Sequence, residues 1–116
     1  MLHVGLLNIH GLSDHKREDR DFQSYVNSYD IVAFAEAFND SSGNLPEFTS
    51  PFLTKPTKRK RRGRPSGRIS VYCKSSIRRG VTEEQKFNFA IWFKLDKTLL
   101  GLSKTTLLGI CYIKPY

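Results

Sequence analysis

The sequence predicts a mixed α/β fold in which one main helix packs on a sheet of about five strands. Three observations predict it. A strand, a helix and a second strand follow one another within residues 2–36. Residues 39–67 are rich in Pro, in turn-forming residues and in cations, and are expected to form a long loop. Strand-like segments then return, so the sheet should contain both parallel and antiparallel strands.

The first half of the chain has the pattern of a strand–helix–strand unit. A strand is expected over residues 2–9, a helix over residues 15–28 and a strand over residues 30–36. The helix carries one apolar stripe at helical spacing, and this stripe is expected in the core: Phe22, Tyr25, Val26 and Tyr29. Its opposite face is charged and consists of Lys16, Arg17, Asp19 and Arg20. A crossover of this length usually makes its two strands parallel.

The second strand ends in a single carboxylate, that of Glu36. A carboxylate at the end of a buried strand is costly unless something pairs with it. In an α/β sheet, ligands bind at the carboxyl ends of the strands. Glu36 is therefore either the reacting centre of the chain or an ordinary loop acid.

The second half of the chain predicts further strands over residues 68–73, 87–95 and 105–113. The middle strand alternates clearly, with these residues on one face: Phe87, Phe89, Ile91, Phe93 and Leu95. Trp92 lies on its other face. Because only one good helix is available, one face of the sheet is expected to stay bare and to favour association.

Composition limits the class of protein. The 116 residues make one domain at most, and a hydrophobic fraction of 39% is too high for a disordered tail. Neither a membrane helix nor a secretory signal is expected. Cys73 and Cys111 lie in strand-like runs without zinc-ligand spacing, so we expect two buried thiols and an intracellular location, with the nucleus as one option.

The net charge of +8 is concentrated in one segment. Lys55 to Arg64 holds seven cations and no acid, which leaves the rest of the chain close to neutral. Residues 55–68 are called the basic segment below. Three interpretations stay open: a solvated loop, a nuclear-localisation-like peptide, or an arm that contacts phosphates. The cations expected to contact nucleic acid are Lys58, Arg59, Lys60, Arg61, Arg62 and Arg64.

Four motifs occur in an order that resembles a known family. They are Asn8-Ile9-His10-Gly11-Leu12, the strand ending in Glu36, Gly63-Arg64-Pro65-Ser66-Gly67 and Tyr112-Ile113-Lys114-Pro115. Together they resemble the amino-terminal half of the endonuclease/exonuclease/phosphatase superfamily, and most closely the endonuclease domains of non-LTR retrotransposons. The resemblance covers essentially the whole chain and implies half of a four-layered αββα sandwich.

The resemblance implies roles for three residues. Glu36 matches the carboxylate that binds the catalytic metal, normally Mg²⁺. Asn8 matches the amide that holds the metal-site carboxylates and the scissile phosphate, and Tyr112 matches a tyrosine that contacts the phosphate. The residues also allow simpler interpretations, because Asn8 can cap a turn and Tyr112 can simply pack.

Two departures from the family pattern limit what can be expected. Arg68 stands where the retrotransposon pattern has a second Gly, and Lys114 replaces a small residue or Pro. The family's Gly-Asp-x-Asn and Ser-Asp-His segments do not occur in these 116 residues. We therefore expect a Mg²⁺-dependent endonuclease-like half-domain that binds DNA, does not cleave alone, and lacks a carboxy-terminal half or self-associates. The alternative is a non-catalytic module that binds nucleic acid or a partner through the basic segment.

Overall fold

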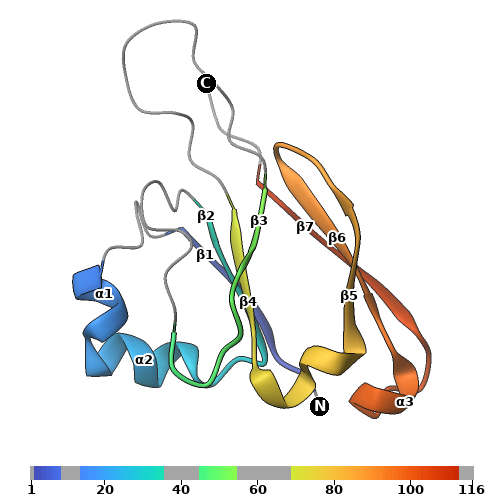
Figure 1. Ribbon diagram of the computed structural model, residues 1–116, viewed down its shortest axis with the longest axis horizontal. Helices are drawn as coiled ribbons and strands as arrows, with labels where there is room; N and C mark the ends of the chain where they lie inside the picture. Colours follow the sequence, from blue (N-terminus) through green and yellow to red (C-terminus); the bar gives the residue numbers. More distant parts are fainter. Residues whose placement is uncertain (1, 9–13, 36–44, 55–68, 113–116) are drawn as a thin grey trace, which may run out of the picture.

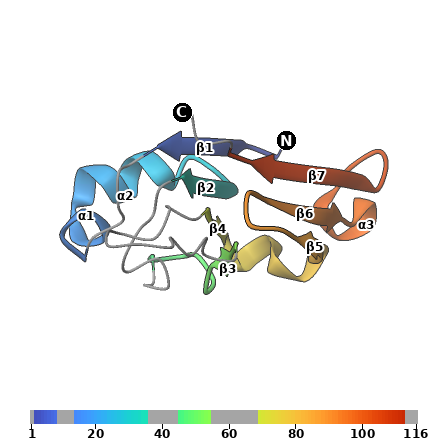
Figure 2. The same ribbon diagram turned by 90° about the horizontal axis from the view of Figure 1, so that it is seen from above.

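The computed structural model describes residues 2–8, 14–35, 45–54 and 69–112. In this part of the chain a layer of helix, a four-stranded sheet and a three-stranded sheet lie one behind the other (Figures 1 and 2). The mixed class of helix and sheet is confirmed. The described residues contain seven strands rather than about five, and they divide into two sheets.

The first sheet has the strand order β1-β2-β4-β3. Its strands are β1 (Val4–Asn8), β2 (Ile31–Ala35), β3 (Phe52–Leu53) and β4 (Ser70–Cys73). β1 and β2 are parallel, as the strand–helix–strand pattern predicts, and β4 runs antiparallel to both β2 and β3. Every residue of β2 is buried, because the helical layer covers one face of this strand and the second sheet covers the other.

The prediction of a single helix over residues 15–28 is wrong. The chain forms α1 (Asp14–Glu18) and α2 (Arg20–Val26), with Asp19 between them. The carboxylate of Asp19 accepts a hydrogen bond from the backbone N–H of Phe22 at 3.0 Å and so caps α2. An Asp side chain that satisfies a backbone donor in this way competes with a continuous helix.

The predicted apolar stripe is only partly buried. Val26 is buried, and the ring of Phe22 lies 5.7 Å from that of Phe34 in β2. Tyr25 is 53% exposed, which contradicts the prediction that it lies in the core. Arg17 was expected on the charged face, yet it is only 7% exposed. The break at Asp19 separates Arg17 in α1 from the stripe in α2, so the two short helices can present different faces to the sheet.

The second sheet consists of three antiparallel strands in the order β5-β6-β7. They are β5 (Val81–Lys86), β6 (Ala90–Leu95) and β7 (Thr106–Cys111), with the 3-10 helix η1 (Ser75–Gly80) before β5 and α3 (Lys97–Leu100) after β6. The sequence does not predict β5. This edge strand is exposed at every position after Val81, so it lacks the apolar alternation that marks a half-buried strand.

The strand expected over residues 87–95 is shorter than predicted. β6 begins at Ala90, and only Ile91, Phe93 and Leu95 of the predicted apolar face are buried. The rings of Phe87 and Phe89 stack on each other in the turn between β5 and β6, with centroids 5.9 Å apart. Both rings are exposed, because the turn projects beyond the opposing sheet.

Two apolar clusters hold the layers together. One lies between the sheets and includes Ile31, Val71 and Phe93; the other lies under the helices and includes Val26, Phe34 and Tyr72. No helix among the described residues has both the length and the apolar character needed to cross a membrane. Cys73 is buried as predicted, whereas Cys111 is exposed because it points away from the inter-sheet core.

Candidate functional site at one end of the first sheet

A set of backbone contacts at the start of β2 aligns three strands. The backbone N–H of His3 donates to the Asp30 carboxylate at 2.8 Å, and the N–H of Asp30 donates to the carbonyl of His3 at 2.8 Å. The N–H of Lys74 donates to the carbonyl of Asp30 at 2.9 Å. β1 and β2 therefore start together, and β4 ends beside them.

This alignment brings Asn8 and the strand end that precedes Glu36 to one rim of the sheet. Asn8, the last residue of β1, lies opposite Ala35, the last residue of β2. Glu36 is the next residue in the sequence, but it lies outside the described residues. Asn8 is exposed at this rim. The ends of β1 and β2 therefore lie side by side, and the roles of Asn8 and Glu36 stay predictions.

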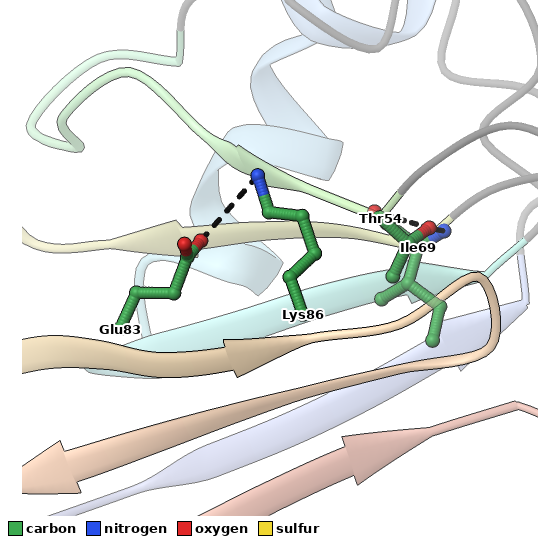
Figure 3. Close-up of polar contacts among 4 residues, drawn as sticks. All are labelled: Thr54, Ile69, Glu83 and Lys86. Carbon is green, nitrogen blue, oxygen red and sulfur yellow. Dashed lines mark hydrogen bonds and ion pairs between the residues drawn. The ribbon is translucent and has the colours of Figure 1, made fainter.

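The two residues that flank the basic segment, Thr54 and Ile69, lie at the same rim. The backbone N–H of Ile69 donates to the Thr54 hydroxyl oxygen at 2.9 Å, and the N–H of Thr54 donates to the carbonyl of Ile69 at 3.1 Å (Figure 3). Both residues are buried. Ile69 precedes Ser70, which lies opposite Phe34 near the end of β2. Thr54 and Ile69, the residues that flank the basic segment, therefore lie together beside the end of β2, and this pair is called the base of the basic segment below.

The six cations predicted to contact nucleic acid are themselves outside the described residues. They are Lys58, Arg59, Lys60, Arg61, Arg62 and Arg64. What the structure establishes is where the segment that carries them leaves and re-enters the sheet. Thr54 is the residue that sequence reasoning missed here; its place directly before the basic segment is the only sequence signal for this role.

Tyr112 lies at the same end of the molecule but in the other sheet. It follows β7, and β1, β2 and β7 all run toward this end (Figure 1). The backbone N–H of Tyr112 donates to the carbonyl of Phe89 at 2.9 Å, and its half-buried side chain packs against the inter-sheet core. The side chain of Tyr112 thus contributes to packing, and a phosphate contact stays a prediction.

A buried polar group lies behind this rim, on the helical side of the sheet. Burial raises the pKa of Tyr72, while its side-chain hydrogen bond to Ser70 and the nearby charge of Arg17 lower that pKa and partly offset the effect of burial. All three residues are less than 10% exposed. Arg17 therefore brings a cation close to the first sheet, which its position on a predicted solvent-facing stripe did not indicate.

The described residues do not form a metal site on their own. Mg²⁺ is usually held through carboxylates and other oxygen ligands in octahedral geometry. Within residues 2–8, 14–35, 45–54 and 69–112, no group of three or more His, Cys, Asp or Glu side chains is placed to hold a metal ion. Asn8 supplies one neutral amide.

Comparison with known proteins found no matching family model, no matching curated protein and no matching solved structure. The assignment to a family therefore remains an expectation from the sequence motifs.

Proposed function

We propose that this chain is a DNA-binding half of a Mg²⁺-dependent endonuclease-like domain, which does not cleave DNA by itself. One observation supports the proposal most: the ends of β1 and β2 and the base of the basic segment share one rim of the first sheet. A phosphodiester bound by the basic segment would pass close to Asn8 and to the strand end that precedes Glu36.

In this proposal the basic segment supplies the affinity for DNA. Cations that neutralise phosphates release counterions, so binding is strong at low salt, insensitive to sequence and weakened by added salt. Asn8 orients a phosphate or a carboxylate by hydrogen bonding without adding charge. Glu36 supplies one ligand of the Mg²⁺ ion, and Tyr112 approaches the phosphate from the other sheet.

Cleavage needs groups that this sequence does not contain. Activating a water molecule requires a positioned base, and the family's Asp-x-Asn and Asp-His segments, which supply it, are absent from the 116 residues. A second polypeptide segment would have to contribute them. The alternative function is binding alone, in which the basic segment holds nucleic acid at the rim and no metal is involved.

The DNA-binding part is tested by charge neutralisation with a matched control. Changing Lys58, Arg59 and Lys60 to Gln should weaken binding to duplex DNA and flatten the slope of log K against log salt concentration by about 2 to 3. The control changes three exposed lysines elsewhere, Lys94, Lys97 and Lys104, to Gln. Equal losses in the two triple variants would show that binding follows net charge and would refute a role for the basic segment.

The catalytic part is tested by nicking of supercoiled plasmid in Mg²⁺. We expect no nicking by the chain alone. Nicking that requires Mg²⁺ and disappears in Glu36→Gln would establish a nuclease that is complete in this chain, contrary to the proposal. Salt-sensitive binding without any nicking, even when candidate second-half segments carrying Asp-x-Asn and Asp-His are added, would favour the binding-only alternative.

We also propose that the open edges of the two sheets recruit either the missing half or a second copy. β1 and β7 are edge strands and lie on the same side of the molecule (Figure 2). Val4 and Leu6 of β1 are 40% and 49% exposed, although they lie in register with the core residues Ile31 and Ala33. An edge strand with exposed apolar residues is a template for pairing with another chain.

Sedimentation over a range of protein concentrations tests this association. Leu6→Lys should shift the chain toward monomer, because a charge on β1 opposes strand pairing. Leu99→Lys is the matched control, since Leu99 is 54% exposed and belongs to α3 rather than to an edge strand. A wild-type chain that stays monomeric at all concentrations and melts cooperatively would contradict the proposed need for a partner.

A further inference from the structure

The outer face of the second sheet contains a hollow that the proposed function does not use. Trp92 and Leu107 are exposed there, on the side of β6 and β7 that faces away from the core residue Phe93. Together with Glu84 and Gln85 of β5 they line a hollow of about 260 Å³. An aromatic ring, a carboxylate and an amide thus converge on one small surface.

A β-bulge in β5 makes this convergence possible. Glu83 lies opposite Phe93 and Gln85 lies opposite Trp92, so Glu84 is an extra residue in the strand. In a regular strand two successive side chains point to opposite faces. A bulge changes the direction of side chains locally, and here it lets both Glu84 and Gln85 line the same hollow.

The Trp92 ring beside the hollow packs closely against Gly109 of the neighbouring strand β7. Gly109 of β7 lies opposite Trp92, and a Cβ atom at Gly109 would be 2.6 Å from the ring. The ring therefore rests against the bare backbone of β7. Gly109 is required for this close approach, since any side chain there would push the ring away.

The charge on this surface comes from Glu84. Its neighbour Glu83 is paired with Lys86, with 3.5 Å between the charged atoms (Figure 3). Within the described part of the chain, neither an ion pair nor a hydrogen bond engages the side chain of Glu84, although Lys94 is exposed on the same face of the sheet. The carboxylate of Glu84 is thus available to a ligand.

We propose that this hollow binds an arginine side chain of a partner polypeptide. A guanidinium group is planar and stacks on the face of an indole ring, where its charge is attracted by the π electrons. It also donates hydrogen bonds in a fork that matches a carboxylate, which Glu84 supplies, while the Gln85 amide oxygen accepts a further one. The anionic Glu84 repels phosphates, so a stacked nucleotide fits this surface less well. The site is separate from the rim proposed to bind DNA and does not depend on that function.

The full chain allows a direct measurement, because Trp92 is its single tryptophan. We expect the peptide acetyl-Gly-Arg-Gly-amide to change Trp92 fluorescence saturably, with a dissociation constant of roughly millimolar size. The same peptide with citrulline in place of arginine keeps the shape without the charge and should bind at least about fivefold more weakly. Glu84→Gln should weaken binding of the arginine peptide about three- to tenfold.

Glu83→Gln is the matched control, because it removes the same charge from the adjacent residue. It should change the affinity less than about twofold, since Glu83 already pairs with Lys86. Gly109→Ala is a second variant that moves the ring without altering charge, and it should also weaken binding. Far-ultraviolet circular dichroism verifies that each variant is folded.

Four results would overturn the proposal. Equal affinities for the citrulline and arginine peptides would show that the charge of the guanidinium group does not contribute to binding. Equal losses of affinity in Glu83→Gln and Glu84→Gln would show that the peptide responds to the general negative charge of the surface and not to a specific site. Tighter binding of a single-stranded oligonucleotide than of the peptide at Trp92 would assign the surface to nucleic acid. A fluorescence change that follows protein concentration, and is lost in Glu84→Gln, would assign it to a second copy.

Discussion

Replacing Thr54 by Val tests how much one buried hydroxyl group contributes to the stability of the base of the basic segment. Thr54 is 1% exposed, and its hydroxyl oxygen accepts the backbone N–H of Ile69 at 2.9 Å. Val has nearly the same shape but no acceptor. The substitution therefore leaves the buried N–H of Ile69 without the partner it has in the structure.

The expected loss follows from the cost of an unsatisfied buried donor, which is about 1–3 kcal/mol. With a urea slope of roughly 1.5 kcal/mol per molar, a loss of about 2 kcal/mol lowers the unfolding midpoint by about 1.3 M. Thr54→Ser keeps the acceptor and removes one methyl group, which costs about 1 kcal/mol. Thr54→Val should thus be the less stable of the two variants, opposite to the order expected from apolar burial.

The assay is urea unfolding followed by circular dichroism at one fixed protein concentration, because association would add to the measured stability. Thr82→Val on the exposed part of β5 is the matched control and should change the midpoint little. Amide hydrogen exchange at Ile69 should accelerate in Thr54→Val alone. If Thr54→Val proves as stable as Thr54→Ser, the hydroxyl group does not hold the base of the basic segment.

Two further predictions concern the thiols and the helical layer. Burial raises the pKa of Cys73 to about 11, so near pH 8 a thiol reagent should label the exposed Cys111 in the folded chain and Cys73 only after unfolding. The pKa of Cys73 is higher in the folded chain than in the unfolded chain, where it is near 9. The stabilising contribution of the thiol is therefore present below pH 9 and is lost as the pH rises toward 11. Wild type should thus lose more stability over this pH range than Cys73→Ala. Rapid labelling of both thiols without denaturant would contradict the burial. A Cβ added at Gly5 would lie 2.5 Å from the Tyr29 ring, so Gly5→Ala should lower the free energy of unfolding by about 1–3 kcal/mol. The same substitution should cost much less in a chain that also carries Tyr29→Ala. Equal costs in the two backgrounds would show that the Tyr29 ring does not obstruct a side chain at position 5.

The sequence correctly predicts those strands whose own pattern of apolar residues shows which of their faces are buried. β2 is apolar throughout and is buried on both faces, and β6 alternates where one face meets the core. The parallel pairing of β1 with β2 follows from the length of the crossover between them. These signals are local, so neighbouring residues in the chain suffice to read them.

The errors occur where a distant contact or one polar side chain decides the structure. Asp19 interrupts the predicted helix by capping α2, and Tyr25 of α2 is exposed although Val26 beside it is buried. β5 has no apolar alternation because only its pairing with β6 makes it a strand. The burial of Arg17 likewise depends on how the short helices sit against the sheet.

For the candidate site, the sequence alone determined which residues carry the chemistry: the amide of Asn8, the carboxylate of Glu36 and the cations of the basic segment. Only the tertiary structure decided that the end of β1 and the base of the basic segment meet beside the end of β2. The reason is physical, because strand register is set by hydrogen bonds such as those between His3 and Asp30 and between Thr54 and Ile69, which join positions far apart in the chain. The β-bulge that places Glu84 and Trp92 around the same hollow also depends on the tertiary structure, because it arises where β5 pairs with β6.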